Sequence, residues 1–200
     1  MSGALPTSPA FAELNIESIQ QTIVSRTISG KRQVRQIGGQ YWKLFASYPP
    51  MTRAEFAPIH AFMIKQRGAY ESFTVTPPVL GIAQGPGGGT PLVNGASQTG
   101  RSVVTDGWPT GATLTVLKAG DYIKFANHTK VYMVTADTVA DTNGDATISI
   151  EPALLSSPVD NTAVTYSSVS FTVYFDGDAL EFSTDQSGFY QFELEICEAF

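Results

Sequence analysis

The chain has 200 residues with 12 basic and 18 acidic side chains, so its formal net charge is −6. This balance, without any run of basic residues, argues against specific nucleic-acid binding, and no apolar stretch approaches the roughly 20 residues that a membrane span needs. Charged residues make up 15% and apolar residues 42%, which fits a β-rich protein that uses much of its surface in assembly.

Charge is distributed unevenly along the chain. Residues 18–68 hold eight basic side chains and one acidic one, whereas residues 69–200 hold four basic and fifteen acidic ones. A basic part and an acidic part suit head-to-tail or ring contacts between copies. The alternative is that both are ordinary solvated faces.

The single cysteine, Cys197, excludes an internal disulfide and a metal site built from cysteines alone. Its place in an apolar strand pattern predicts a small core residue. The first residues lack the basic region and apolar run of a cleaved export signal. We therefore expect the protein to be made in a reducing cytoplasm.

The first 48 residues are predicted to form an extended arm, residues 1–9, followed by β-strands between Leu14 and Tyr48. Apolar residues recur there with the period of two that is typical of strands. Glycine-containing turn signals at 29–31 and 38–39 divide the region. Three antiparallel strands in a meander are expected, and Pro49-Pro50 ends them.

One helix is predicted over residues 52–67. Thr52 is a good N-cap, and Glu55 completes a capping box. Gly68 is a natural C-cap. Pro58 is expected to kink the helix or delay its start, because its ring removes a backbone donor. The helix carries an apolar stripe that would pack on a sheet, made of Phe56, Ile59, Met63 and the aliphatic stem of Lys65, with Phe62 alongside.

After a strand at 71–76, residues 79–99 are rich in Gly, Pro, Asn and Ser and are predicted to be a linker or loop. Short strands then recur about every ten residues, which is typical of a small Greek-key barrel or sandwich. The predicted strands are Ser102–Thr105, Thr113–Val116, Tyr122–Phe125, Lys130–Thr135, Ala146–Ile150, Ala163–Tyr166 and Ser170–Phe175.

The last strand, around residues 189–196, has one fully apolar side and needs a hydrophobic sheet to join. We therefore predict a mainly β fold with one helix and an inserted second domain. Residues 1–78 and 176–200 would form the first, β-sandwich-like domain, and residues 100–175 a small barrel.

No catalytic device is apparent. His60 and His128 are interpreted as structural or surface residues, and the glycines of 85–89 lack the lysine of a phosphate-binding loop. Asp141 begins a pattern like a calcium loop, but the Asn-Gly hairpin turn explains it better. We expect neither an enzyme nor a cofactor or metal site.

Three blocks of sequence carry a resemblance to a known family. The first contains Gln40-Tyr41-Trp42, Ser47-Tyr48-Pro49, Phe62, Gly68 and Tyr70. The second runs Ala119-Gly120-Asp121-Tyr122-Ile123-Lys124-Phe125, His128-Thr129-Lys130-Val131-Tyr132 and Ile148-Ser149-Ile150-Glu151-Pro152, and the third is Val169–Val173. In order and spacing they resemble the distal tail proteins of long-tailed, non-contractile bacteriophages, in particular the small two-domain kind.

This resemblance implies a structural virion protein at the tail tip, made in the host cytoplasm. It implies a ring of six copies, formed by the first domain, that joins the tail-tube protein to the baseplate hub. The second domain, similar to an oligonucleotide/oligosaccharide-binding (OB) barrel, would lie outside. Candidate ring contacts are Arg26, Lys31, Arg32, Arg35, Trp42, Lys43, Arg53 and Arg67.

Two alternatives stay open. The barrel could be a receptor-binding module for a host surface saccharide, which an exposed aromatic cluster would support. The candidate aromatics are Trp108, Tyr122, Tyr132 and Tyr166, which are equally suited to a core. A tail-tube or tail-terminator protein is the other alternative, and a tube protein would form stacked rings.

Overall fold

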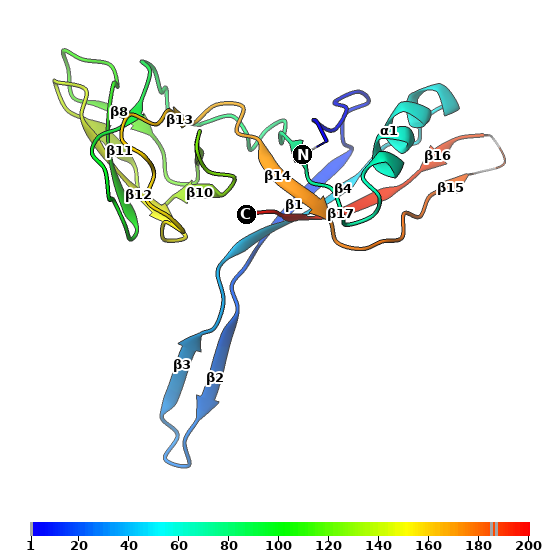
Figure 1. Cartoon of the computed structure of the whole chain (residues 1–200), viewed down its shortest axis with the longest axis horizontal. Coiled ribbons are helices and arrows are strands. Elements are labelled where there is room, and N and C mark those ends of the chain that lie inside the picture. Colours follow the sequence, from blue (N-terminus) through cyan, green and yellow to red (C-terminus); the bar gives the residue numbers. More distant parts are fainter. Residues whose placement is uncertain (1, 185, 187) are drawn as a thin grey trace. The chain divides into compact units, whose positions relative to one another are not determined.

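A computed structural model describes residues 2–184, 186 and 188–200. Its contacts divide the chain into two compact units. The first comprises Met1–Phe73 and Val173–Glu198, and the second comprises Thr74–Thr172 with Ala199–Phe200. The mainly β fold with one helix is confirmed (Figure 1).

The first unit is built on a sheet in the order β1-β4-β17-β14-β5. Strand β4, between β1 and β17, alternates strictly, with Trp42, Leu44 and Ala46 buried on one face. The neighbouring strand β17 continues that apolar face with Leu194 and Ile196. The bounds are β1 Glu13–Ile19, β4 Tyr41–Ser47, β17 Glu193–Glu198, β14 Phe171–Phe175 and β5 Phe73–Val75.

Helix α1, Arg53–Lys65, packs on this apolar face through Phe56, Ile59 and Met63 of the predicted stripe, whereas Lys65 is exposed. The capping box is confirmed: the carboxylate of Glu55 accepts the backbone N–H of Thr52 at 2.9 Å. Pro58 lies inside the helix without delaying its start. Among the residues described, no helix has the length and hydropathy that a membrane span requires.

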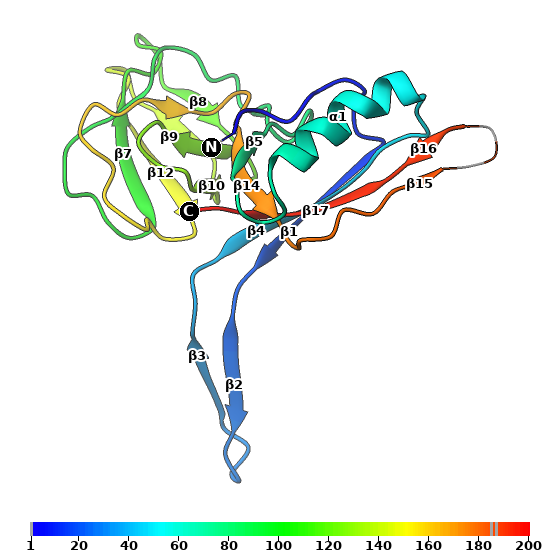
Figure 2. The ribbon, with the colours of Figure 1, turned by 45° about the vertical axis from the view of Figure 1, so that its right-hand side comes forward.

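Between β1 and β4 the chain leaves the sheet and forms a two-stranded hairpin, β2 (Thr22–Arg26) and β3 (Arg32–Gln36) (Figures 1 and 2). We call residues 20–38 the arm. The predicted three-stranded meander is therefore wrong, since β1 pairs directly with β4. The ladder is interrupted beside Gly38, and neither face of β2 or β3 is buried. The predicted turn at 29–31 is the arm's tip, where Gly30 has φ +80°.

The second unit holds a sheet in the order β13-β9-β10-β12-β7-β6. Its two ends meet at a bridge between Leu92 and Ala163, where the N–H of Val93 donates to the carbonyl of Thr162 at 2.9 Å. The sheet therefore closes into a small barrel, flanked by the pair β8–β11. The bounds are β6 Leu92–Val93, β7 Ser102–Asp106, β8 Leu114–Leu117, β9 Tyr122–Phe125, β10 Val131–Val134, β11 Thr138–Ala140, β12 Ala146–Glu151 and β13 Val164–Thr165.

All seven strands predicted over 100–175 are present within about two residues. Two elements were not predicted, β6 and β11, because two or three residues are too few to show a period. Strand β14 had been assigned to the barrel, but its residues Val173–Phe175 pair with β17 in the five-stranded sheet. A local pattern identifies a strand without naming its partner.

The segment 79–99 is not a free tether, since much of it packs into the barrel unit. Gly88 donates its N–H to the hydroxyl of Tyr166 at 2.8 Å. Gly89 approaches the carbonyl of Gly107 so closely that an added Cβ would lie 2.1 Å from that oxygen. The buried carboxylate of Asp121 accepts the N–H groups of Gln84 and Gly85 at 2.7 and 3.2 Å. These contacts make the loop part of the barrel wall.

Candidate assembly surface

Both faces of the arm combine apolar and basic side chains, but only one of them carries two arginines. Strands β2 and β3 pair in a register that sets Val24 opposite Val34 and Arg26 opposite Arg32. Side chains two residues apart lie on the same face of a strand. One face therefore carries a valine pair, 49% and 51% exposed, beside an arginine pair. We call it the valine–arginine face.

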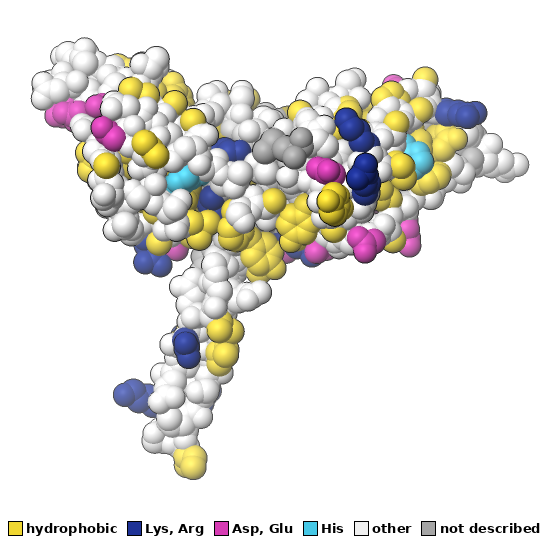
Figure 3. Space-filling model, viewed as in Figure 1, with side chains coloured by type: hydrophobic (Ala, Val, Ile, Leu, Met, Phe, Trp, Pro, Cys, Tyr) yellow, Lys and Arg dark blue, Asp and Glu magenta, His cyan; other side chains and the backbone are white. Residues whose placement is uncertain are grey.

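Two arginines directly opposite each other repel, which destabilises an isolated hairpin. No acidic residue lies within the arm, and none of its cations forms an ion pair with any residue that the structure describes. A two-stranded hairpin is only marginally stable in water by itself. Its charge and exposed valines therefore fit a partner outside the folded unit (Figure 3).

Four of the eight predicted contact residues gather on the arm. Arg26, Lys31, Arg32 and Arg35 are all exposed there. Arg53 and Arg67 are exposed too, but at opposite ends of α1, where Arg67 has φ +59°. The structure does not bring these two beside each other.

Trp42 and Lys43 are engaged within their own unit. Trp42 is buried as a core residue. Lys43 lies 2.6 Å from the carboxylate of Asp176 and also contacts that of Glu195, and these hydrogen bonds raise its pKa. Neither side chain is presented freely to a neighbouring subunit.

The four barrel aromatics do not form an open platform for a sugar. Trp108, Tyr122 and Tyr132 are buried, and Tyr166 is half-buried and holds Gly88. Trp108 also donates its indole N–H to the hydroxyl of Thr105 at 2.9 Å. Their arrangement is that of a core.

The other residues considered for chemistry have structural roles. Burial lowers the pKa of His128, whose Nε2 lies 3.1 Å from the hydroxyl of Ser156. The carboxylate of Asp141 accepts the N–H groups of Asn143 and Asp145 and so closes the turn before β12. His60 stacks on Phe56 with ring centroids 5.1 Å apart.

We expect Cys197 to be unreactive in the folded protein. The side chain is buried, and burial raises the pKa of its thiol to about 11. At pH 8 roughly one thousandth of the folded thiol would be thiolate, against about a quarter of an ordinary exposed one. Titration with a chromogenic disulfide reagent should therefore show almost no modification until denaturant is added. Equal rates in the native and the denatured protein would contradict this buried placement.

Comparison with known proteins connects the two units to one family. Residues 83–169, which lie within the barrel unit, match the family described as "Distal tail protein pb9, B domain". The chain is also 24% identical over 192 residues to "Distal tail protein pb9" of Escherichia phage T5, an alignment that covers 92% of this chain and 91% of that protein. The chain is therefore similar to a phage distal tail protein over most of its length.

These two similarities support a structural protein of a phage tail. The alignment with the T5 protein covers most of both chains, so it includes the arm-bearing unit as well as the barrel. The family match to the barrel does not cover the first unit. The arm of that unit carries four of the eight predicted contacts.

Proposed function

We propose that this chain forms a closed ring of six copies at the tail tip, where it joins the tail-tube protein to the baseplate hub. The observation that supports the ring is the arm, an exposed basic and apolar hairpin whose charges have no partner among the residues described in its own unit. When head-to-tail contacts between copies close into a ring, the arm of every copy has one neighbouring copy to contact. The OB-like topology of the barrel is part of the same proposal.

The distribution of charge supports contacts between copies. All charged side chains of the arm are basic, whereas most acidic residues of the chain lie after residue 68. Opposite charges on two surfaces of one chain favour association between copies and fix its direction. A ring that forms by such contacts should weaken as salt screens them.

Cryo-electron microscopy of intact virions tests this proposal. We expect one six-fold ring of this chain between the tube and the hub. Repeated copies along the tube would instead make it a tube protein, and its absence from the particle would overturn a role in the virion.

A variant whose arm is shortened provides the matching biochemical test. Replacing residues 21–38 by Asn-Gly should leave the denaturation midpoint nearly unchanged, because the arm buries no side chain of the core. The same variant should fail to enter the ring. Normal incorporation of this variant would show that the arm is not the subunit contact.

A further inference from the structure

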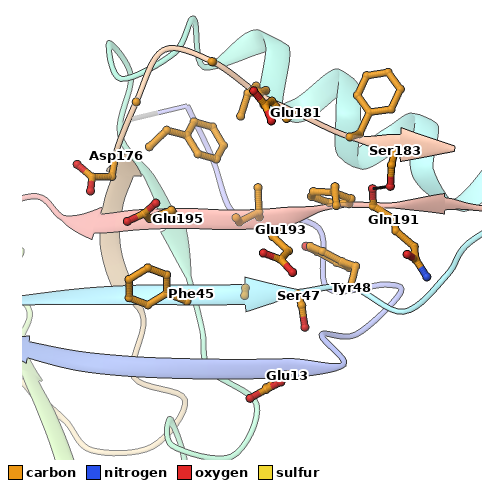
Figure 4. Close-up of a pocket in the computed structure, with 18 of the residues that line it drawn as sticks. Glu13, Phe45, Ser47, Tyr48, Asp176, Glu181, Ser183, Gln191, Glu193 and Glu195 are labelled. Atoms are coloured by element: carbon orange, nitrogen blue, oxygen red, sulfur yellow. Dashed lines mark hydrogen bonds between the residues drawn. The ribbon is translucent and has the colours of Figure 1, made fainter.

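The first unit contains a groove where the strand pairing beside β17 is interrupted. The N–H of Asp176 donates to the carbonyl of Glu195, and pairing resumes where Ser183 in β15 (Ser183–Thr184) meets Gln191 in β16 (Tyr190–Gln191). Between these points residues 177–182 run opposite only Phe192–Leu194. The longer side bulges away from β17, and the resulting groove has a volume of about 820 Å³ (Figure 4).

The groove is acidic. Its lining includes five carboxylates and no basic side chain, namely Glu13, Asp176, Glu181, Glu193 and Glu195. Lys43, at its border, pairs with Asp176 and Glu195. Among the residues that the structure describes, no cation pairs with Glu13, Glu181 or Glu193. Three negative charges in the groove are therefore uncompensated.

Strand pairing places two of these charges on one face of the sheet, with one strand between them. Ser47 lies opposite Glu13 on one side and opposite Glu193 on the other. The carbonyl of Phe192 accepts the N–H of Tyr48 at 3.3 Å, so the main chain of Glu193 faces the opposite way, toward the bulge. The floor of the groove thus offers carboxylates and a strand edge.

Tyr48 is also among the residues at the groove. It is 95% buried on the face of the sheet opposite to Ser47 and Glu193, and its ring stacks on Phe192 with ring centroids 4.5 Å apart. Its hydroxyl has no hydrogen-bond partner among the described residues. The groove therefore offers a partner its carboxylates and its strand edge.

We infer that this groove receives the arm of a second copy of the chain, with the valine–arginine face turned inward. Arg26 and Arg32 would supply positive charges to pair with Glu181 and Glu193. Guanidinium groups bind carboxylates with two parallel hydrogen bonds. The valine pair suits the groove's apolar lining, which includes Phe45, Leu180 and Phe182. This inference rests on the proposed ring, for which it supplies the receiving surface.

Cross-linking between two differently marked full-length chains tests the contact. One chain carries Thr22→Cys, on the valine–arginine face, and the other carries Ser47→Cys, on the groove floor. Because each chain has one added thiol, a short bismaleimide can join them only between copies. We expect a cross-linked dimer at high protein and low salt concentration. Ser25→Cys, on the arm's opposite face, is the matched control and should give about tenfold less.

Charge reversal makes the test specific. Glu181→Lys with Glu193→Lys in the groove chain should reduce the product about tenfold, because like charges oppose each other. Arg26→Glu with Arg32→Glu in the arm chain should then restore it. The denaturation midpoints of these variants show that the fold is kept. No product, equal product from Ser25→Cys, or no response to charge would each overturn the inference.

These outcomes can be told apart from a failure of the proposed ring. A six-fold ring at the tail tip without this cross-link would leave the ring in place and show that the groove binds something else. The cross-link in a protein that repeats along the tube would support the groove contact and overturn the tail-tip role.

Discussion

Replacing Asp121 by alanine is expected to destabilise the barrel by about 3 kcal/mol or more, since it leaves several buried donors without an acceptor. The carboxylate of Asp121 is 2% exposed and accepts three backbone N–H groups, from Gln84, Gly85 and Lys118, at 2.7, 3.2 and 2.8 Å. These contacts fasten the 79–99 loop to the turn before β9. The denaturant midpoint of the variant should fall, and proteases should cleave near residues 84–89 first.

Asp137→Ala is the matched control for this prediction. Its carboxylate also accepts a backbone N–H, that of Ala119 at 3.0 Å, but it lies on the surface beside Lys118. Water can replace an exposed acceptor, so a small change is expected. If both variants lowered the midpoint equally, the three buried bonds of Asp121 would not be the anchor of the loop.

Gly89→Ala is expected to be the second severe change in the barrel. Gly89 has φ +67°, and a Cβ there would lie 2.1 Å from the carbonyl oxygen of Gly107. That oxygen also accepts the N–H of Thr90 at 3.0 Å, so it cannot move without breaking a bond. Backbone strain and this clash together should cost about 3 kcal/mol or more, measured by urea denaturation.

Gly111→Ala separates the two causes. Gly111 also has a positive φ, +92°, but nothing lies within 4 Å of an added Cβ. It should therefore show only the backbone penalty, about 1–2 kcal/mol. A Gly89 variant no less stable than this control would mean that the loop yields easily and that the close approach to Gly107 is unimportant.

Local chemistry explains which features were predictable. The helix was found because Thr52 and Glu55 form a capping box three residues apart, and the barrel strands because their apolar residues alternate. Asp121 was noticed as part of a family-like block, but its role as a loop anchor depends on Gln84, 37 residues earlier. No sequence pattern predicts that contact.

Some features of the candidate site could likewise be predicted from the sequence, and others could not. The basic character of residues 26–35 and the alternation of Glu193 with Leu194 are visible in the sequence. The arm could not be distinguished from an ordinary meander, because its strands have strand-like spacing although both faces stay exposed. Trp42 and Lys43 are predicted ring contacts, but the pleat turns one into the core and the other toward Asp176.

The sequence by itself determined the mainly β class, the single helix, most strands and the likeness to distal tail proteins, because these depend on short-range periodicity and on the order of motifs. Only the tertiary structure decided that β14 joins the first sheet, that the arm stands free, and that Glu13 and Glu193 flank Ser47 on one face. Strand pairing brings together residues as distant in sequence as Lys43 and Cys197, and its register is set by packing rather than by any local signal.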